Sequence, residues 1–294
     1  MYARSVRGGE ALRLASGVLR ASAAGMVLRG TLDPLLADAL GLGKISVGPP
    51  YFGLLFLVLM APLVLLLPFG PLTKWQRDEP SWAVFALVLG VVGYFIAPQG
   101  PLKTAAGIAA SAWVAFGTLR FVWTRFQVKG SRFTPEMLGM TLAHGGVAVF
   151  LIGALLVEAL SVQREMAMKP GQTVEIGRHA FRFEGVDQMR GPNYTSERGH
   201  VQILRNDTLL VRLNPEKRAY ASGGQIMTEA AIRPGLFGDI YVAVGEALGN
   251  DAHAVRVHVK PFVRWIWLGA ALMALGGFVT ATDRRFRSKP EDQR

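Results

Sequence analysis

The chain has 294 residues, of which 51% are hydrophobic and only 18% are charged. The mean hydropathy is +0.30, and the apolar residues form long runs, a pattern typical of membrane proteins. The net charge of +11 does not indicate nucleic-acid binding, because many basic residues flank apolar runs and no basic stripe carries interleaved aromatics. The chain has no cysteine, which excludes disulfides, thiolate metal sites and redox dithiols within it.

Residues 1–50 predict an N-terminal helix followed by a turn segment. Residues 11–36 are largely apolar, but arginines interrupt them, and a central arginine is costly to insert into a membrane. Whether residues 11–36 span the membrane therefore stays open. Arginines are scattered through residues 1–30, which argues against a cleavable signal peptide. The Gly- and Pro-rich residues 41–50 predict a turn that cannot be regular helix.

Residues 51–161 predict a group of membrane-spanning helices. Each of four apolar segments approaches the ~20 residues that a bilayer requires; they lie at about 51–69, 81–97, 104–124 and 135–160. Pro62 predicts a kink in the first of them. Residues 262–294 predict one last span and a basic tail. By the positive-inside rule this tail is cytoplasmic, which places the segment before the last span outside the cytoplasm.

Residues 162–261 change in character, with short alternating segments and turn signals that predict a β domain. Gly177-Arg178 and Asn206-Asp207 each separate two such segments, as the turns of β-hairpins do. The predicted fold class is an α-helical polytopic membrane protein with an inserted extracytoplasmic β domain, a small barrel or sandwich.

One histidine is the clearest candidate for chemistry. Thr134-Pro135-Glu136 is a typical helix start, with a hydroxyl N-cap, a proline at the first position and an acid near the positive helix end. Between residues 137 and 156, His144 is the only side chain that ionises readily. An imidazole in lipid is costly unless it is paired or ligated, which makes it a functional-site candidate by default.

Small residues surround this histidine: Gly145, Gly146 and Ala148. They would allow either another helix or a flat macrocycle to approach the backbone. The pattern leaves three roles open for His144: a haem or metal ligand, a proton relay, or a structural hydrogen bond. No other predicted span contains a histidine. A second histidine ligand for a membrane haem would therefore have to come from another polypeptide.

The remaining four histidines lie in the predicted β domain without zinc-ligand spacing. The acids and bases of this domain form no recognisable catalytic dyad, and no Gly-rich phosphate loop follows a strand. Catalytic residues therefore stay unknown, and the sequence gives no support to an autonomous hydrolase or kinase.

Several stretches together resemble the carboxyl-terminal part of the CcmF family of cytochrome c-type biogenesis proteins. This family comprises the haem lyases of the multi-component cytochrome c maturation system. Besides LAHGGVA at 142–148, the matching residues are 30–35, 41–52, 214–220, 227–232, 239–246, 260–267, 276–277 and 283–285. They cover the chain from about Gly30 to Arg285 in the family's order. The family has a tyrosine where Asp33 stands.

The resemblance implies that His144 is one of two membrane histidines that ligate a permanent haem b, thought to reduce the incoming haem. The second axial ligand is expected from another chain or from a missing N-terminal half. Other implied partners are the haem chaperone, apocytochrome c and its thiol-handling proteins. The implied location is the bacterial inner membrane, with several spans, the β domain in the periplasm and the C-terminus in the cytoplasm.

The family's tryptophan-rich segment, its outward-facing histidines and its other membrane histidine lie upstream of the matched region. The resemblance therefore implies a split subunit or a fragment of a haem lyase that contributes to activity together with a partner. On the β domain, Pro215, Lys217, Arg218, Glu229 and Glu246 are candidates for partner contacts, with maintenance of the fold as the alternative role of each. Two other functions remain open: a proton-coupled membrane transporter, and a structural membrane anchor for the β domain.

Overall fold

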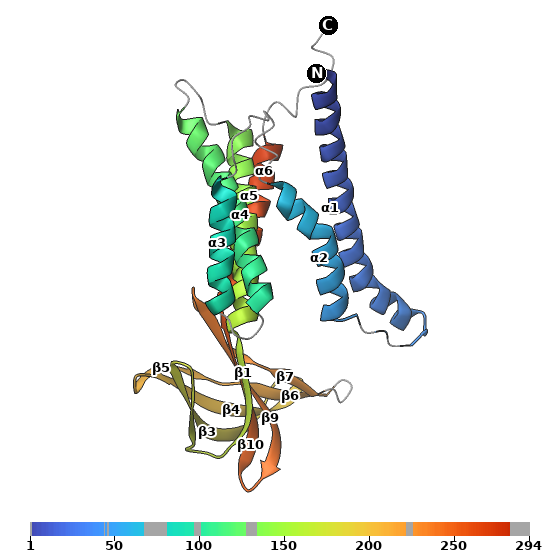
Figure 1. Cartoon of the computed structure of the whole chain (residues 1–294). Helices are drawn as coiled ribbons and strands as arrows, with labels where there is room; N and C mark the ends of the chain where they lie inside the picture. Colours follow the sequence, from blue (N-terminus) through green and yellow to red (C-terminus); the bar gives the residue numbers. More distant parts are fainter. Residues whose placement is uncertain are drawn as a thin grey trace. The chain divides into compact units, whose positions relative to one another are not determined.

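A computed structural model of the chain (Figure 1) describes residues 2–43, 45, 47–67, 81–96, 101–127, 134–221 and 226–282. It forms two compact units, each described here by itself. The first comprises Met1–Val91, Ile108–Ala148 and Leu272–Arg294, and the second comprises Val92–Gly107 and Val149–Ala271. The helices are α1 (Tyr2–Ala39), α2 (Pro49–Leu66), α3 (Ser81–Ile96), α4 (Pro101–Gln127), α5 (Pro135–Leu160) and α6 (Val263–Ala281).

Three of the described helices are long and apolar enough to cross a membrane: α4 over Leu102–Gln127, α5, and α6. Two further segments predicted to span, at about 51–69 and 81–97, form the apolar helices α2 and α3, whose apolar parts are shorter. Residues 68–80 and 97–100, which connect these predicted spans, and the predicted basic tail from Asp283 lie outside the described residues.

Residues 11–36 lie within the single helix α1, which is not among the three helices of sufficient length and apolarity. Three of its described charged side chains, Arg20, Arg29 and Asp33, have partners along the helix itself. Arg29 Nε lies 3.1 Å from Asp33 Oδ2, and Arg20 Nε donates to the carbonyl of Ser16 at 3.1 Å. These (i, i+4) contacts lower the cost of placing the charged groups on an otherwise apolar helix.

Helix α2 begins within the segment predicted as a turn. Gly41 and Gly43 have φ angles of +68° and +99°, as expected for a turn, but Pro49 and Pro50 already form the first turn of α2. Prolines fit there because the first N–H groups of a helix have no intrahelical partner. The predicted non-helical segment is therefore two residues too long.

The start of α5 matches its sequence signal. Thr134 is the N-cap: its Oγ1 accepts the backbone N–H of Met137 at 3.3 Å, and its carbonyl accepts the N–H of Leu138 at 2.9 Å.

Residues 162–261 form a sandwich of two antiparallel sheets, which confirms one of the two predicted β architectures. The first sheet has the order β1-β10-β9-β8, and the second has the order β2-β3-β4-β6-β7 with β5 paired to β4. The strands are β1 (Val162–Met168), β2 (Thr173–Ile176), β3 (His179–Arg190), β4 (Tyr194–Arg205), β5 (Thr208–Leu213), β6 (Glu216–Tyr220), β7 (Ile226–Glu229), β8 (Ala231–Arg233), β9 (Gly238–Gly249) and β10 (Ala252–Pro261).

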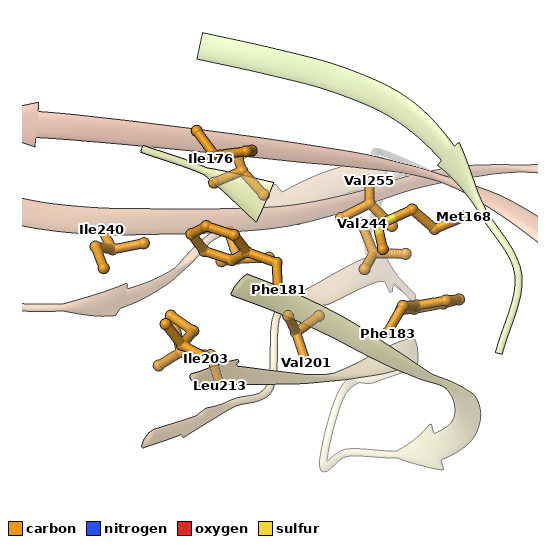
Figure 2. Close-up of a cluster of buried hydrophobic side chains, with 12 residues drawn as sticks. Met168, Ile176, Phe181, Phe183, Val201, Ile203, Leu213, Ile240, Val244 and Val255 are labelled. Carbon is orange, nitrogen blue, oxygen red and sulfur yellow. The ribbon is translucent and has the colours of Figure 1, made fainter. Parts of the chain in front are cut away.

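The side chains of the two sheets meet in one hydrophobic core (Figure 2). Phe181 and Phe183 of β3 are fully buried, and they face Val244 of β9 and Val255 of β10 across the sandwich. Burial of such aromatic and aliphatic surface is the main favourable contribution to folding in water.

Both predicted hairpin turns are present. Gly177 has a φ of +62° between β2 and β3, and Asn206 and Asp207 have φ of +49° and +58° between β4 and β5. Two adjacent residues with positive φ give a turn whose twist matches that of the flanking strands. Asn250 and Asp251 form a third turn of this kind, between β9 and β10.

The β domain is joined to the helices by two neighbouring strands. Strand β1 begins two residues after the end of α5, and β10 ends two residues before the start of α6. The two strands are antiparallel partners, with Val162 opposite Val259. Both chain connections therefore leave the sandwich side by side.

Candidate functional site

His144 lies in the middle of α5 and is half-buried. Its Nδ1 is 2.9 Å from the carbonyl oxygen of Met140, one turn earlier. A carbonyl only accepts hydrogen bonds, so in the tautomer with the proton on Nδ1 this nitrogen donates to Met140 and Nε2 keeps its lone pair. The backbone of Leu67, just after α2, also lies within hydrogen-bonding reach of the ring. The ring therefore has two backbone neighbours, Met140 within its own helix and Leu67 after α2.

The small residues that the sequence groups with His144 lie on different faces of α5. A Cβ atom added to Gly145 would meet no atom within 4 Å. Gly146 is buried, and Ala148 is 6% exposed, with its carbonyl accepting the Ser111 hydroxyl of α4 at 2.9 Å. Of the three, Gly145 alone borders open space.

Gly146 shares its face of α5 with a close helix contact. Seven residues correspond to about two turns of α-helix, so Gly146 lies nearly above Gly139. A Cβ on Gly139 would lie 2.6 Å from the carbonyl oxygen of Gly276 in α6 and would overlap Thr280. This glycine face serves helix packing, as small residues in membrane helices commonly do.

The described residues include no group of three His, Cys, Asp or Glu side chains that could hold a metal ion. A single imidazole is a poor site for a free ion, but it is sufficient as one axial ligand of a metal that a macrocycle already holds. By its ligand chemistry a lone imidazole such as His144 therefore fits a haem better than it fits a bare metal.

The β domain contains an ionic cluster that the sequence does not reveal. Glu216 is 6% exposed; its Oε1 accepts Arg198 Nε at 2.7 Å, and its Oε2 accepts Arg218 Nε at 2.8 Å. The hydrogen bond from Arg218, together with that from Arg198, lowers the pKa of Glu216 although burial opposes the shift. The guanidinium of Arg218 also lies 4.6 Å from the ring centre of Tyr194. We name Glu216, Arg198, Arg218 and Tyr194 together the Glu216 cluster.

The five predicted contact residues of the β domain have different surroundings. Arg218 belongs to the Glu216 cluster. Lys217 pairs with the exposed Glu246 at 2.6 Å, whereas Glu229 is half-buried opposite Glu216. Pro215 is buried, and its carbonyl accepts the N–H of Gly199 in β4 at 2.8 Å. Pro215 therefore serves the fold.

Three histidines of the β domain, His179, His200 and His258, have separate surroundings. His200 lies between Asn214 Oδ1 at 3.1 Å and Asp187 Oδ2 at 2.9 Å. Burial lowers the pKa of His179, with Arg205 and Arg233 adding to the effect. Burial and then Lys260 lower the pKa of His258.

Comparisons with known proteins agree with this architecture. Residues 159–261 match the family model of the CcmF C-terminal beta-sandwich. The chain is 43% identical to cytochrome c-type biogenesis protein CcmF of Pseudomonas aeruginosa over 293 residues, which cover 95% of the chain and 45% of that protein. It is 38% identical to CcmF of Escherichia coli, covering 97% of the chain and 45% of that protein.

A solved structure named cytochrome c heme lyase CcmF has the same fold, with a TM-score of 0.69 and 20% identity. The match covers 91% of the chain and 45% of that structure. The chain therefore spans about 45% of the length of the relatives that it matches. By sequence and by fold, it corresponds to the carboxyl-terminal part of the CcmF family of cytochrome c-type biogenesis proteins.

Proposed function

We propose that the chain acts in cytochrome c biogenesis as the C-terminal part or subunit of a haem lyase, and that His144 is an axial ligand of a membrane haem b. The observation that carries this proposal is the similarity to CcmF proteins over 95% of the chain. His144 is the only histidine before residue 179, so it is the chain's one imidazole within the membrane helices.

The hydrogen bonding of His144 supports this role. A histidine that ligates a metal donates its other ring N–H to an acceptor, which fixes the orientation and tautomer of the ring. The carbonyl of Met140 is such an acceptor for Nδ1, which makes Nε2 the nitrogen for iron. Iron at this position would have to displace the neighbouring backbone of Leu67.

Beside His144, only the side of α5 at Gly145 has open space into which a planar ligand could fit. Gly145 borders open space, whereas Ala148 is in contact with α4 and Gly146 lies on the face of the α6 contact. We therefore assign Gly145 to the haem contact and the other two residues to helix packing beside it. A bound haem would supply a one-electron redox centre.

The partners follow from the part of the family that the chain matches. A second axial ligand would come from another chain or from a missing N-terminal half, either of them the counterpart of the N-terminal half of CcmF. The haem chaperone and apocytochrome c would then meet the β domain in the periplasm. The chain would sit in the bacterial inner membrane with its C-terminus in the cytoplasm, as the basic residues of the tail favour.

The experiment is to co-purify the chain with its upstream partner and to record the absorption spectrum. We expect a Soret band that is lost in His144→Gly and returns when imidazole is added, because free imidazole can occupy the vacated position. His258→Ala is the control, since its ring lies in the β domain. A Soret band unchanged in His144→Gly would overturn the assignment of His144, and a complex that never contains haem would favour the transporter or anchor.

A further inference from the structure

A turn with two large apolar side chains at its tip lies between β8 and β9. The N–H of Gly238 donates to the carbonyl of Gly235 at 3.3 Å, which closes a β-turn around Leu236 and Phe237. Both side chains are 64% exposed. Gly, Pro, Asn, Asp and Ser dominate turns in water, so an exposed Leu-Phe pair at these positions requires an explanation.

This turn contacts Phe262, the residue directly before α6, and through its ring Trp265 of α6. The carbonyl of Phe237 accepts the N–H of Phe262 at 3.0 Å, and the two rings pack edge to face with centres 6.1 Å apart. The ring of Phe262 in turn packs against Trp265 of α6 at 5.4 Å. Phe262 has a φ of +60°. This conformation is unfavourable for a bulky side chain, so the surrounding contacts must maintain it.

A buried carboxylate makes the junction rigid. Asp239 is 7% exposed, and its Oδ1 accepts both the N–H of Gly235 at 2.8 Å and Nε of Arg264 at 3.2 Å. One oxygen atom thus joins the turn to the first turn of α6. The turn cannot move independently of the helix end.

We infer that the turn 235–238 is a membrane-surface anchor, in which Leu236 and Phe237 enter the boundary between lipid headgroups and acyl chains. The position of the turn carries the inference: it is bonded to the residue directly before α6, a helix long and apolar enough to cross a membrane. Phe and Leu side chains are among those with which interfacial segments enter this level of the bilayer. Arg233 and Arg264 flank the turn, where they can meet anionic headgroups.

The anchor would set the orientation of the whole β domain. The two chain connections leave the sandwich side by side, so the domain can tilt about them, whereas a further contact with the lipid surface restrains it. The inference uses only the geometry of the β domain and α6, and it does not depend on haem binding.

The absence of cysteine from the chain makes the test direct. We would prepare full-length Phe237→Cys and Leu236→Cys, label each with an environment-sensitive fluorophore, and reconstitute them into phosphatidylcholine–phosphatidylglycerol vesicles. The control is Leu248→Cys, which is also exposed, at 57%. It lies ten residues beyond Gly238 along β9, about 30 Å from the turn.

We expect blue-shifted emission at 236 and 237, loss of most of the fluorescence with nitroxide-labelled lipids, and little effect of iodide. The label at 248 should respond to iodide and not to the lipids. Iodide quenching at 236 and 237 equal to that at 248 would overturn the inference, as would protection from both quenchers, which would mean that protein covers the turn.

Discussion

The β sandwich and the membrane-type helices bury different side chains. In the sandwich the fully buried residues are large, with Phe181 and Phe183 at the centre. In the helices the most buried residues include small or hydroxylated ones such as Thr104, Ser111 and Ala148, whereas Phe95 and Trp267 are 78% and 73% exposed.

The difference reflects the solvent that each part meets. Water drives large apolar side chains into a core, but lipid solvates them as well as a protein interior does. Helix association in lipid then depends on close backbone contact and hydrogen bonds, as at Gly139 and Ser111. The rule that large apolar side chains lie inside therefore holds for the sandwich and fails for the helices.

The largest expected effect tests the core of the sandwich. Phe181→Ala should cost about 3–5 kcal/mol, because it removes a ring from a core that cannot collapse fully. Hydrogen exchange of peptides from β3 and β4 in the detergent-solubilised chain would report this loss as faster exchange. Leu209→Ala, at a side chain that is 47% exposed, should leave the exchange nearly unchanged. Equal effects of the two variants would contradict the assignment of the core.

The Glu216 cluster tests electrostatics inside the same domain. Glu216→Gln should cost about 1.5–3 kcal/mol, since hydrogen bonds to charged groups are lost. The pKa of Glu216 is lowered below its ordinary value of 4.5. The ionised cluster therefore stabilises the fold fully above about pH 4.5, and this contribution disappears as the pH falls through the lowered pKa.

Acid unfolding followed by hydrogen exchange of β4 and β6 peptides measures this effect. Glu216→Gln should flatten the acid limb of the stability curve. Glu246→Gln is the control, because Glu246 is exposed and such a surface pair contributes about 0–1 kcal/mol. An unaltered acid limb in Glu216→Gln would mean that the cluster contributes nothing to the pH dependence.

A pair of glycines tests the helical part. Gly139→Ala should destabilise the packing of α5 and α6 by about 1–3 kcal/mol, because its Cβ would overlap backbone atoms of α6. Gly145→Ala has open space and should be neutral or slightly stabilising. Thermal unfolding in detergent, followed by helical circular dichroism, distinguishes the two. If Gly145→Ala lowered the stability more than Gly139→Ala does, the assignment of the open and packed faces of α5 would be reversed.

The smallest expected effect concerns one hydrogen bond between helices. Ser111→Ala removes the bond to the carbonyl of Ala148, and such bonds contribute about 0.6 kcal/mol in a membrane protein. Thr141→Ala removes a bond within α5 to Met137 and is the matched control. The same thermal-unfolding assay measures both variants. A loss of stability in Ser111→Ala far above that in Thr141→Ala would show that this hydrogen bond dominates the contact between α4 and α5.

The sequence is sufficient to predict structural features whose residues are neighbours along the chain. Thr134 marked the start of α5, and Gly177 and Asn206 marked two hairpin turns, because caps and turns depend on neighbouring residues. The turn at Asn250-Asp251 has the same signal, but it was not singled out. The predicted start of the span at about 51–69 is two residues later than the start of α2, because Pro49 and Pro50 occupy the first turn of the helix.

The non-local features could not be found in this way. The Glu216 cluster depends on the pairing of β4 with β6, which brings together residues 18 positions apart. The three small residues near His144 looked like one group in the sequence, yet successive residues of a helix point about 100° apart. Only the structure separates the open side at Gly145 from the packed side at Gly146.

The pairing of β1 with β10 has a consequence for how such a protein can be built and altered. Because entry and exit of the sandwich are hydrogen-bonded neighbours, the whole domain is an insertion whose ends meet. A short connector could replace it without changing the separation of the helix ends, and an unrelated domain with adjacent termini could be exchanged for it. The sandwich could therefore be exchanged without altering the membrane part, because the two are connected only through the paired strands β1 and β10.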